Sequence, residues 1–396
     1  MKICMLIYMF PPIVGGGEIG AFETAAAIAR EGHEVHVLTS HYPGLKRYEE
    51  MQGVKVHRNI VGCFIDPYNA AEKASKQMSA LSMVSFMKLA IPALLSLNNK
   101  ERFDVIHSEF VLPAGVSGAL VGSLQGTPSV VTLVGGDIFT PSEPFFMSFL
   151  RHLAMPLYKI AFTSKLTAIS SDSAKRARSL GAHGKIDITP YGVDLSLFKK
   201  EKKNPELAKK LGLRKGPTIV SVCRLSKRKG LSYLLEAMSR LHSKFPDVNI
   251  ILVGDGPERK RLEDLARRLN LDKNTIFTGA VEHDKLPDYY NLGDIFVLPS
   301  LHEGLGIVFM EAMACGLPVI TTNKGGMVDI IEDEKTGFLI EPENSAQIEE
   351  QLLKLLRNES LRKRMSDSAQ AKAINDFSWK SAAARYIKAY REAIKG

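Results

Sequence analysis

The chain has 396 residues, of which 45% are hydrophobic and 24% are charged, a composition typical of soluble globular proteins with two or three domains. It excludes an intrinsically disordered protein, a collagen-like repeat and a miniprotein held together by disulfides. The formal net charge of +9 comes from one segment, because residues 199–229 contain 12 basic and 2 acidic residues. Nucleic-acid binders usually spread their basic residues along a face, so we expect no nucleic-acid partner.

The N-terminal sequence predicts a buried strand rather than a secretory signal, since it lacks a small-residue cleavage site. The apolar stretch 81–97 is interrupted by Lys88 and Pro92 and would make a poor membrane span. Four scattered cysteines form no C-x-x-C pair, so we expect reduced core thiols in a cytoplasmic protein. They are Cys4, Cys63, Cys223 and Cys315.

Short apolar runs alternate with amphipathic segments along the chain, a pattern typical of βαβ units around parallel sheets. In the first half this pattern predicts strands over residues 3–8, 34–39, 54–57, 105–107, 129–133, 166–169 and 187–189, and helices over 18–31 and 171–180. In the second half it predicts strands over 218–222, 249–253, 275–277, 295–298, 318–321 and 338–340, and helices over 231–243, 259–270, 346–356 and 379–395.

A composition break separates the two sets of strands, because a lysine-rich stretch follows residues 190–198 and resembles an interdomain linker. The fold class expected is therefore α/β, with two doubly wound, Rossmann-like domains facing a cleft. We expect domains over residues 1–192 and 193–376, and a final helix over 377–396 that packs back on the first domain. Such sheets bind ligands at the carboxyl ends of their strands, where the strand order reverses.

Three consecutive glycines, Gly15, Gly16 and Gly17, lie between the first predicted strand and its helix. They would let backbone N–H groups approach a phosphate, or they form only a tight turn. Thr39 and Ser40 stand where an acidic ribose-binding residue is usual in a dinucleotide-binding domain. This argues against a dinucleotide cofactor.

The first predicted strand of the second domain leads into a basic loop that contains Arg224 and Lys229. Two cations at the end of a strand can neutralise a diphosphate without a metal ion, Arg through its planar fork and Lys as a point charge. No Asp-x-Asp motif that would hold a divalent ion beside a nucleotide is evident, so we expect no metal. A solvated basic loop is the alternative.

Glu303 and Glu311 flank a glycine-rich turn and the start of a predicted helix. Their spacing of eight positions corresponds to roughly 12 Å along a helix axis, too far for the paired carboxylates of a glycosidase. We expect Glu311 to bind a ribose and Glu303 the hydroxyls of a sugar, with backbone N–H groups around Leu305, Gly306 and Ile307 facing the phosphates between them. Two ordinary helix-surface glutamates are the alternative.

The segment from Glu303 to Glu311 resembles the E-x7-E motif of retaining glycosyltransferases with the GT-B fold, most closely those of glycosyltransferase family 4. The resemblance covers nearly the whole chain. Further similar segments are the glycine loop ending at Glu18, residues 168–173 and 190–194, the pair Arg224 and Lys229, and the loops 254–256 and 279–281. The resemblance implies that Gly16, Gly17 and, near the nucleotide base, Val281 contact the donor.

Many relatives read H-G-x-D after the fifth strand of the first domain, where this chain has Val134, Gly135, Gly136 and Asp137. A valine supplies no imidazole, although its carbonyl could face the donor sugar. The resemblance implies retention of anomeric configuration by front-face attack assisted by the leaving diphosphate, without a protein nucleophile. Asp137 is the candidate to orient or deprotonate the acceptor hydroxyl, or it is structural.

The function expected is therefore a cytoplasmic, metal-independent, retaining hexosyltransferase. It would move a hexose from a UDP- or GDP-linked donor to a glycan or lipid-linked acceptor, with Glu303, Asp137, Arg224 and Lys229 as its catalytic residues. No metal or pyridoxal cofactor is expected. The alternatives are a GT-B isomerase or phosphorylase, and a non-catalytic nucleotide-sugar-binding protein.

Residues 70–100 combine several lysines with many apolar residues and contain only Glu72 as an acidic residue, so the segment carries a charge of +3. Apolar residues beside lysines can lie in a membrane interface without spanning it. The segment predicts reversible docking of the first domain on an anionic membrane surface. A buried core helix that lines the acceptor cleft is the alternative.

Overall fold

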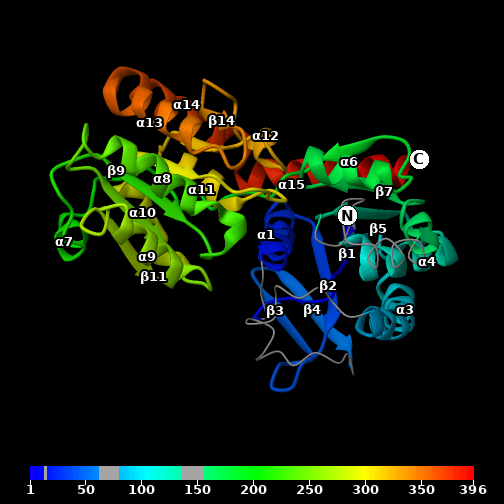
Figure 1. Cartoon of the computed structure of the whole chain (residues 1–396). Coiled ribbons are helices and arrows are strands. Elements are labelled where there is room, and N and C mark those ends of the chain that lie inside the picture. Colours follow the sequence, from blue (N-terminus) through cyan, green and yellow to red (C-terminus); the bar gives the residue numbers. More distant parts are fainter. Residues whose placement is uncertain (13–15, 62–79, 136–154) are drawn as a thin grey trace. The chain divides into compact units, whose positions relative to one another are not determined.

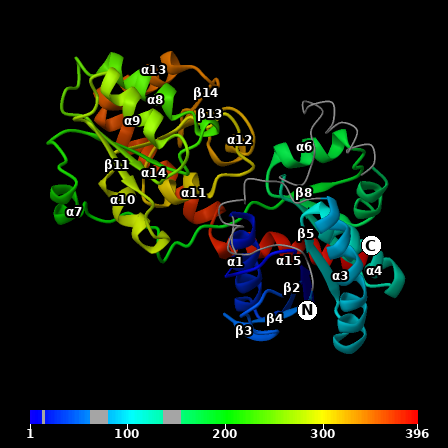
Figure 2. The ribbon, with the colours of Figure 1, turned by 60° about the horizontal axis from the view of Figure 1, so that its bottom comes forward.

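The computed structural model describes residues 1–12, 16–61, 80–135 and 155–396, which form two compact units (Figures 1 and 2). The first unit comprises Met1–Gly192 and Trp379–Gly396, and the second comprises Val193–Ser378. Each unit contains one largely parallel sheet with helices packed against it, which confirms the predicted α/β class with two doubly wound domains.

The sheet of the first unit has eight strands in the order β3-β4-β2-β1-β5-β6-β7-β8. Its strands are β1 (Lys2–Leu6), β2 (Glu34–Ser40), β3 (Tyr48–Met51), β4 (Val54–Ile60), β5 (Val105–Glu109), β6 (Ser129–Leu133), β7 (Lys165–Ala168) and β8 (Ile186–Ile188). All neighbours pair in parallel except β3 and β4. The strand order reverses between β1 and β5, so the loops after these two strands flank the expected ligand crevice of this unit.

Helices cover both faces of this sheet. They are α1 (Gly16–Arg30), α3 (Ala80–Glu101), α4 (Val116–Gln125), α6 (Ser171–Ser179) and α15 (Trp379–Lys395), with a short π-helical turn η1 (Val111–Gly115). Alternate residues of β1 serve the two faces, because Ile3 and Met5 pack with α1 and α15, whereas Cys4 and Leu6 pack with α3.

The C-terminal helix α15 belongs to the first unit. Tyr386 and Tyr390 lie in the hydrophobic core formed with β1, β2 and α1. The Tyr390 hydroxyl is 2.8 Å from Nδ1 of His107 on β5, so a buried polar contact also fixes the helix to the sheet.

The sheet of the second unit has six parallel strands in the order β11-β10-β9-β12-β13-β14. They are β9 (Thr218–Val222), β10 (Asn249–Val253), β11 (Thr275–Gly279), β12 (Ile295–Leu298), β13 (Val319–Thr322) and β14 (Gly337–Ile340). The order reverses between β9 and β12, which places the loops after these two strands at the crevice of this unit.

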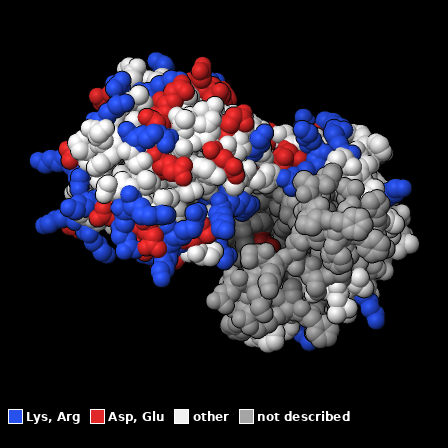
Figure 3. All heavy atoms as spheres, in the orientation of Figure 1, with Lys and Arg blue, Asp and Glu red and all other residues white. Residues whose placement is uncertain are grey.

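The helices of the second unit alternate with the strands as predicted as far as β14, after which two helices follow one another. They are α7 (Pro205–Lys210), α8 (Leu231–Leu241), α9 (Arg259–Arg268), α10 (Leu286–Leu292), α11 (Ile307–Ala314), α12 (Met327–Ile330), α13 (Ser345–Arg357) and α14 (Glu359–Asp376), with the 3₁₀ turns η2 (Lys227–Lys229) and η3 (His283–Lys285). Lysine and arginine are abundant on the surface of this unit, interspersed with acidic residues (Figure 3). On α9, for example, Arg259 pairs with Asp255 and Glu263.

Two features of the first unit differ from the sequence-based expectations. The edge strand β3 was not predicted, because its sequence YEEM lacks the β-branched residues that mark a strand. The described part of the apolar segment 70–100 is the helix α3. One face of α3 is buried through Phe86, Ala90 and Leu94, while Leu81 remains exposed. In length and composition α3 could cross a membrane, but 33% of its apolar window is buried within the protein.

Candidate active site

The loops after β9 and β12 lie against each other at the reversal point of the second sheet. Gly230 ends the β9 loop with φ of +66°, and a Cβ atom there would lie 2.1 Å from the carbonyl oxygen of Pro299. A side chain at this position would therefore separate the two loops. The backbone N–H of Leu301 also donates to the carbonyl of Arg228 at 2.8 Å.

Glu303 lies at the centre of this contact. Its Oε1 accepts a hydrogen bond from Oγ of Ser300 at 2.8 Å and lies 2.5 Å from Nζ of Lys229. A nitrogen of the more exposed Arg228 is 4.0 Å from Oε2. The sequence-based interpretation assigned Lys229 to the diphosphate and Glu303 to the sugar. The structure brings the two side chains into contact, so the ammonium group of Lys229 lies beside both the predicted diphosphate site and the predicted sugar site.

The structure also corrects the estimate of distance along a helix. Glu303 lies in the loop before α11, four residues before the first helical residue, Ile307. The rise of a continuous helix therefore does not apply between Glu303 and Glu311. The loop is held from the other side by Gly326, whose N–H donates to the carbonyl of Glu303 at 2.9 Å.

The first turn of α11 leaves backbone N–H groups without partners in the helix, the arrangement that favours an anion. Leu305 is buried and Ile307 is half-buried beside this turn. Leu305 lies in the loop of Glu303, and Ile307 is the first residue of the helix that carries Glu311. Their role in binding phosphates stays a prediction.

Glu311 is buried on α11 and has two side-chain partners. Its Oε2 accepts a hydrogen bond from the hydroxyl of Tyr290 at 2.7 Å, and its Oε1 is 3.0 Å from Nε2 of His283. Burial, with Glu311 nearby, raises the pKa of Tyr290, so this hydroxyl remains a donor. Sequence reasoning missed both partners, although His283 stands only two positions after the predicted base-contacting residue Val281.

Two further predicted donor-binding residues lie at the same edge of the sheet. Arg224 lies two residues after the end of β9 and is exposed, and within the described part of the chain its guanidinium forms no ion pair. Val281 follows β11 and is half-buried. Burial raises the pKa of the thiol of Cys223, the residue before Arg224, to about 12, which keeps this cysteine protonated and inert.

In the first unit, Gly16 and Gly17 begin α1, the helix that follows β1 along the chain. A Cβ atom on Gly17 would lie 2.8 Å from the ring of Phe110 and 3.6 Å from Val134, so these residues meet at the end of the sheet. Phe110 has a left-handed φ of 71° and was missed by sequence reasoning. The predicted acceptor-activating residue Asp137 and the first glycine, Gly15, lie outside the described residues.

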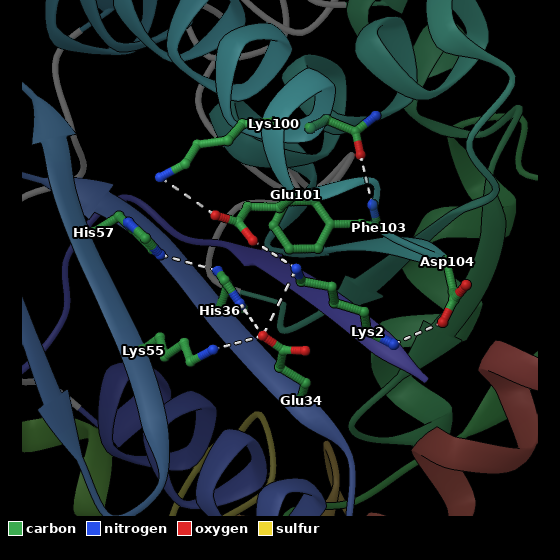
Figure 4. Close-up of polar contacts among 10 residues, drawn as sticks. Lys2, Glu34, His36, Lys55, His57, Lys100, Glu101, Phe103 and Asp104 are labelled. Atoms are coloured by element: carbon green, nitrogen blue, oxygen red, sulfur yellow. Dashed lines mark hydrogen bonds and ion pairs between the residues drawn. The ribbon is translucent and has the colours of Figure 1, made fainter.

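A polar cluster that contains His36 of β2 and His57 of β4 lies toward the opposite, amino-terminal edge of the first sheet (Figure 4). One atom each from Glu34, His36 and Glu101 lies within 4.8 Å of the others, a spacing that would suit a metal ion. However, Nζ of Lys2 lies 2.5 Å from Glu101 and 3.7 Å from Glu34, and Nζ of Lys55 lies 2.6 Å from Glu34. Ammonium groups therefore already neutralise the two carboxylates.

Comparison with known proteins places this geometry in a family. A family model described as "Glycosyltransferase Family 4" matches residues 14–197, and one described as "Glycosyl transferases group 1" matches residues 203–372. Together the two matches span both units.

Similar proteins cover the chain from end to end. It is 25% identical to the N-acetyl-alpha-D-glucosaminyl L-malate synthase of Bacillus anthracis, over 100% of this chain and 98% of that protein. It is 23% identical to the GDP-mannose-dependent alpha-(1-6)-phosphatidylinositol monomannoside mannosyltransferase of Mycolicibacterium smegmatis, over 95% and 94%. The structure of Anabaena HepE in complex with UDP has a TM-score of 0.74 and 22% identity, covering 99% of this chain and all of the other.

The matches to both units, and the GT-B fold of similar solved structures, agree with the motifs at the two sheet edges. The chain belongs to glycosyltransferase family 4, the glycosyl transferases group 1, and has the GT-B fold.

Proposed function

We propose that the protein is a metal-independent, retaining hexosyltransferase that moves a hexose from a nucleoside diphosphate sugar to a glycan or lipid-linked acceptor. The family membership supports glycosyl transfer. The printed names of similar proteins include a GDP-mannose-dependent enzyme that acts on a phosphatidylinositol mannoside and a protein that binds UDP. These names support a nucleotide-linked donor, and they make UDP- and GDP-linked sugars the first donors to test.

The observation that carries the proposal is the grouping of Lys229, Glu303 and the start of α11 at the reversal point of the second sheet. Lys229 contacts Glu303 through one of the three N–H donors of its ammonium group. Its remaining donors, together with the exposed Arg224 and the N-terminus of α11, provide positive charge for a leaving diphosphate. The carboxylate of Glu303 would then bind hydroxyls of the transferred sugar.

In this mechanism the leaving diphosphate assists attack on the same face of the sugar, which retains the anomeric configuration. The protein neutralises the charge that develops on the diphosphate and orients the sugar. Asp137 is the proposed group that orients or deprotonates the acceptor hydroxyl. Because Arg224, Lys229 and the helix supply the positive charge, we expect no divalent ion to be needed.

The test is a panel of UDP-, GDP- and ADP-linked hexoses, in which release of nucleoside diphosphate is measured with and without EDTA. A transferase with slow background hydrolysis releases the diphosphate from at least one donor. NMR of the glycosylated product then gives its anomeric configuration. An inverted product, or activity that EDTA abolishes and Mg²⁺ restores, would contradict the mechanism. A non-catalytic binding protein would release no nucleotide from any donor.

We also propose that the protein acts in the cytoplasm and docks reversibly on the anionic face of a membrane through α3. Exposed apolar residues, Leu81 and Val84, lie at the start of this helix, while Lys88 and Lys100 follow along it. This arrangement suits an interfacial contact.

Sedimentation with vesicles that contain phosphatidylglycerol tests the docking. We expect binding at low salt that high salt reverses, and weaker binding for the double variant Leu81→Ser with Val84→Ser. Leu124→Ser is a matched control, because Leu124 is equally exposed but lies on α4. Protein that remains in the supernatant at low salt would disprove the docking and favour a soluble acceptor.

A further inference from the structure

His283 holds a place beside Glu311 that neither the family resemblance nor the sequence pattern assigned. Its Nε2 lies 3.0 Å from Oε1 of Glu311, while the Tyr290 hydroxyl donates to Oε2 at 2.7 Å. The two partners differ in access to solvent, since the side chain of Glu311 is 4% exposed and that of His283 is 60% exposed. The imidazole therefore lies on the solvent side of a buried carboxylate.

Three separate segments build this arrangement. Glu311 comes from α11, Tyr290 from α10 and His283 from the turn η3 that follows β11. The buried ring of Phe198, from the segment before α7, packs edge-on against His283 at 5.1 Å and against Tyr290 at 5.9 Å. One aromatic ring thus supports both side chains that contact the carboxylate.

The number of acceptor sites on the carboxylate limits what else can bind to it. An ionised carboxylate offers about four lone-pair sites, two on each oxygen. Tyr290 and His283 occupy one site on each oxygen of Glu311. One site remains on each oxygen, which matches the two adjacent hydroxyls of a ribose.

The charge around Glu311 also favours such a ligand. Among the described residues, no lysine or arginine forms an ion pair with Glu311, in contrast to Glu303 and Lys229. A carboxylate held by a phenol and an imidazole keeps its acceptor strength for neutral hydroxyl groups, because no fixed ammonium or guanidinium group competes for its oxygens.

We propose that His283 is a positioning residue for the ribose of the donor nucleotide. Together with Tyr290 it holds the carboxylate of Glu311 in the orientation that accepts hydrogen bonds from the 2′- and 3′-hydroxyls. The inference rests on the proposed function, because it requires a nucleoside diphosphate at this site. The preference for ribose over 2′-deoxyribose then depends on His283, although this side chain does not itself need to touch the sugar.

The experiment compares the dissociation constants of UDP, GDP and ADP with those of their 2′-deoxy forms, by calorimetry on the full chain. For the nucleotide that binds best, we expect the ribose form to bind about 10-fold or more tightly than its 2′-deoxy form. This is the effect of one hydrogen bond to a charged group. In His283→Ala this ratio should fall to about 3 or less, with little change for the deoxy form. His283→Gln should restore the ratio, because its amide also offers an N–H donor.

Asp284→Ala is the matched control, since Asp284 lies on the same turn and pairs only with Lys285 among the described residues. An unchanged ratio in His283→Ala, an equal fall in Asp284→Ala, or tighter UDP binding in His283→Ala would overturn the inference while leaving the proposed function intact. The last result would show that the imidazole competes with the ribose. If the wild-type protein bound none of the three nucleotides, the proposed function would fail together with the inference.

Discussion

One pair of glutamate and lysine lies at the carboxyl edge of the second sheet and another at the amino edge of the first sheet, and the two pairs differ in burial. At the carboxyl edge of the second sheet, the side chains of Lys229 and Glu303 are only 13% and 9% exposed. At the amino edge of the first sheet, the side chains of Lys55 and Glu34 are 38% and 41% exposed (Figure 4). Similar residue types therefore form a costly, partly desolvated pair at the ligand edge and a solvated pair at the other.

The buried pair and the solvated pair differ in what they contribute to the protein. Burying an ion pair seldom stabilises a fold, because desolvation offsets the attraction between the charges. The proposed diphosphate sugar would bring a charge to that edge that gives the pair of Lys229 and Glu303 a function there. The exposed pair at Glu34 lies where the resemblance places no ligand, and simple neutralisation accounts for it.

The largest expected effect is on turnover in Glu303→Gln. This variant keeps the size of the side chain but removes the negative charge beside the sugar, so we expect kcat to fall by about 100- to 1000-fold, with a small change in donor KM. Glu311→Gln should instead mainly raise donor KM, because the ribose that Glu311 is predicted to bind does not react. Steady-state kinetics measure both, and equal defects in the two variants would show that the carboxylates do not have separate roles.

Lys229→Ala should weaken nucleoside diphosphate binding by about 1.5–3 kcal/mol, the range for hydrogen bonds to charged groups. It should also lower the free energy of unfolding by about 3–5 kcal/mol, because Glu303 is left without its buried partner. Arg224→Ala should weaken nucleotide binding similarly without this loss of stability, since Arg224 is exposed.

Calorimetry and urea unfolding measure the two quantities separately. The double variant Lys229→Ala with Glu303→Gln should regain much of the lost stability, because no unpaired charge remains. Nucleotide affinity that is unchanged in both single variants would disprove the diphosphate role.

Acid should destabilise the first unit through the half-buried His57 and the buried His107. Burial lowers the pKa of His57 to about 4 and that of His107 to about 3, so the unfolded chain binds their protons more tightly than the folded chain. Stability is then complete above about pH 6.5 and falls as the pH drops toward 4 and then 3. Melting temperatures between pH 7 and pH 4 measure this, and His57→Asn should make this part of the curve less steep, because only His107 of the two then contributes. A flat wild-type profile would contradict the shifts.

The smallest expected effect is in Lys55→Ala. Its pair with Glu34 is solvated, so we expect a loss of at most about 1 kcal/mol in the free energy of unfolding and no change in kinetics. The contact also lowers the pKa of Glu34, to about 2, so the difference between variant and wild type should disappear as Glu34 is protonated in acid. A loss as large as that of Lys229→Ala would remove the distinction between the two pairs.

Much of the fold follows from local sequence. The predicted bounds 129–133, 218–222, 249–253 and 295–298 agree with β6, β9, β10 and β12, because each is an apolar run between turn-forming residues. The order of strands and helices led to two doubly wound sheets, since βαβ units have few possible topologies. The edge strand β3 was missed because its stability comes from pairing with β4 rather than from its own composition.

The sequence by itself determined which residues stand at the ends of the central strands. Arg224, Glu303 and Gly17 could be chosen because chemistry-bearing residues follow predicted strands, and parallel sheets bind ligands at that edge. Only the tertiary structure decided which of them touch. Lys229 and Glu303 are separated by 74 residues, and His283 and Glu311 by 28. The periodicity of apolar residues indicates which face of a single helix or strand is buried. Contacts between distant residues depend instead on how the loops after different strands pack, so no local pattern could reveal them.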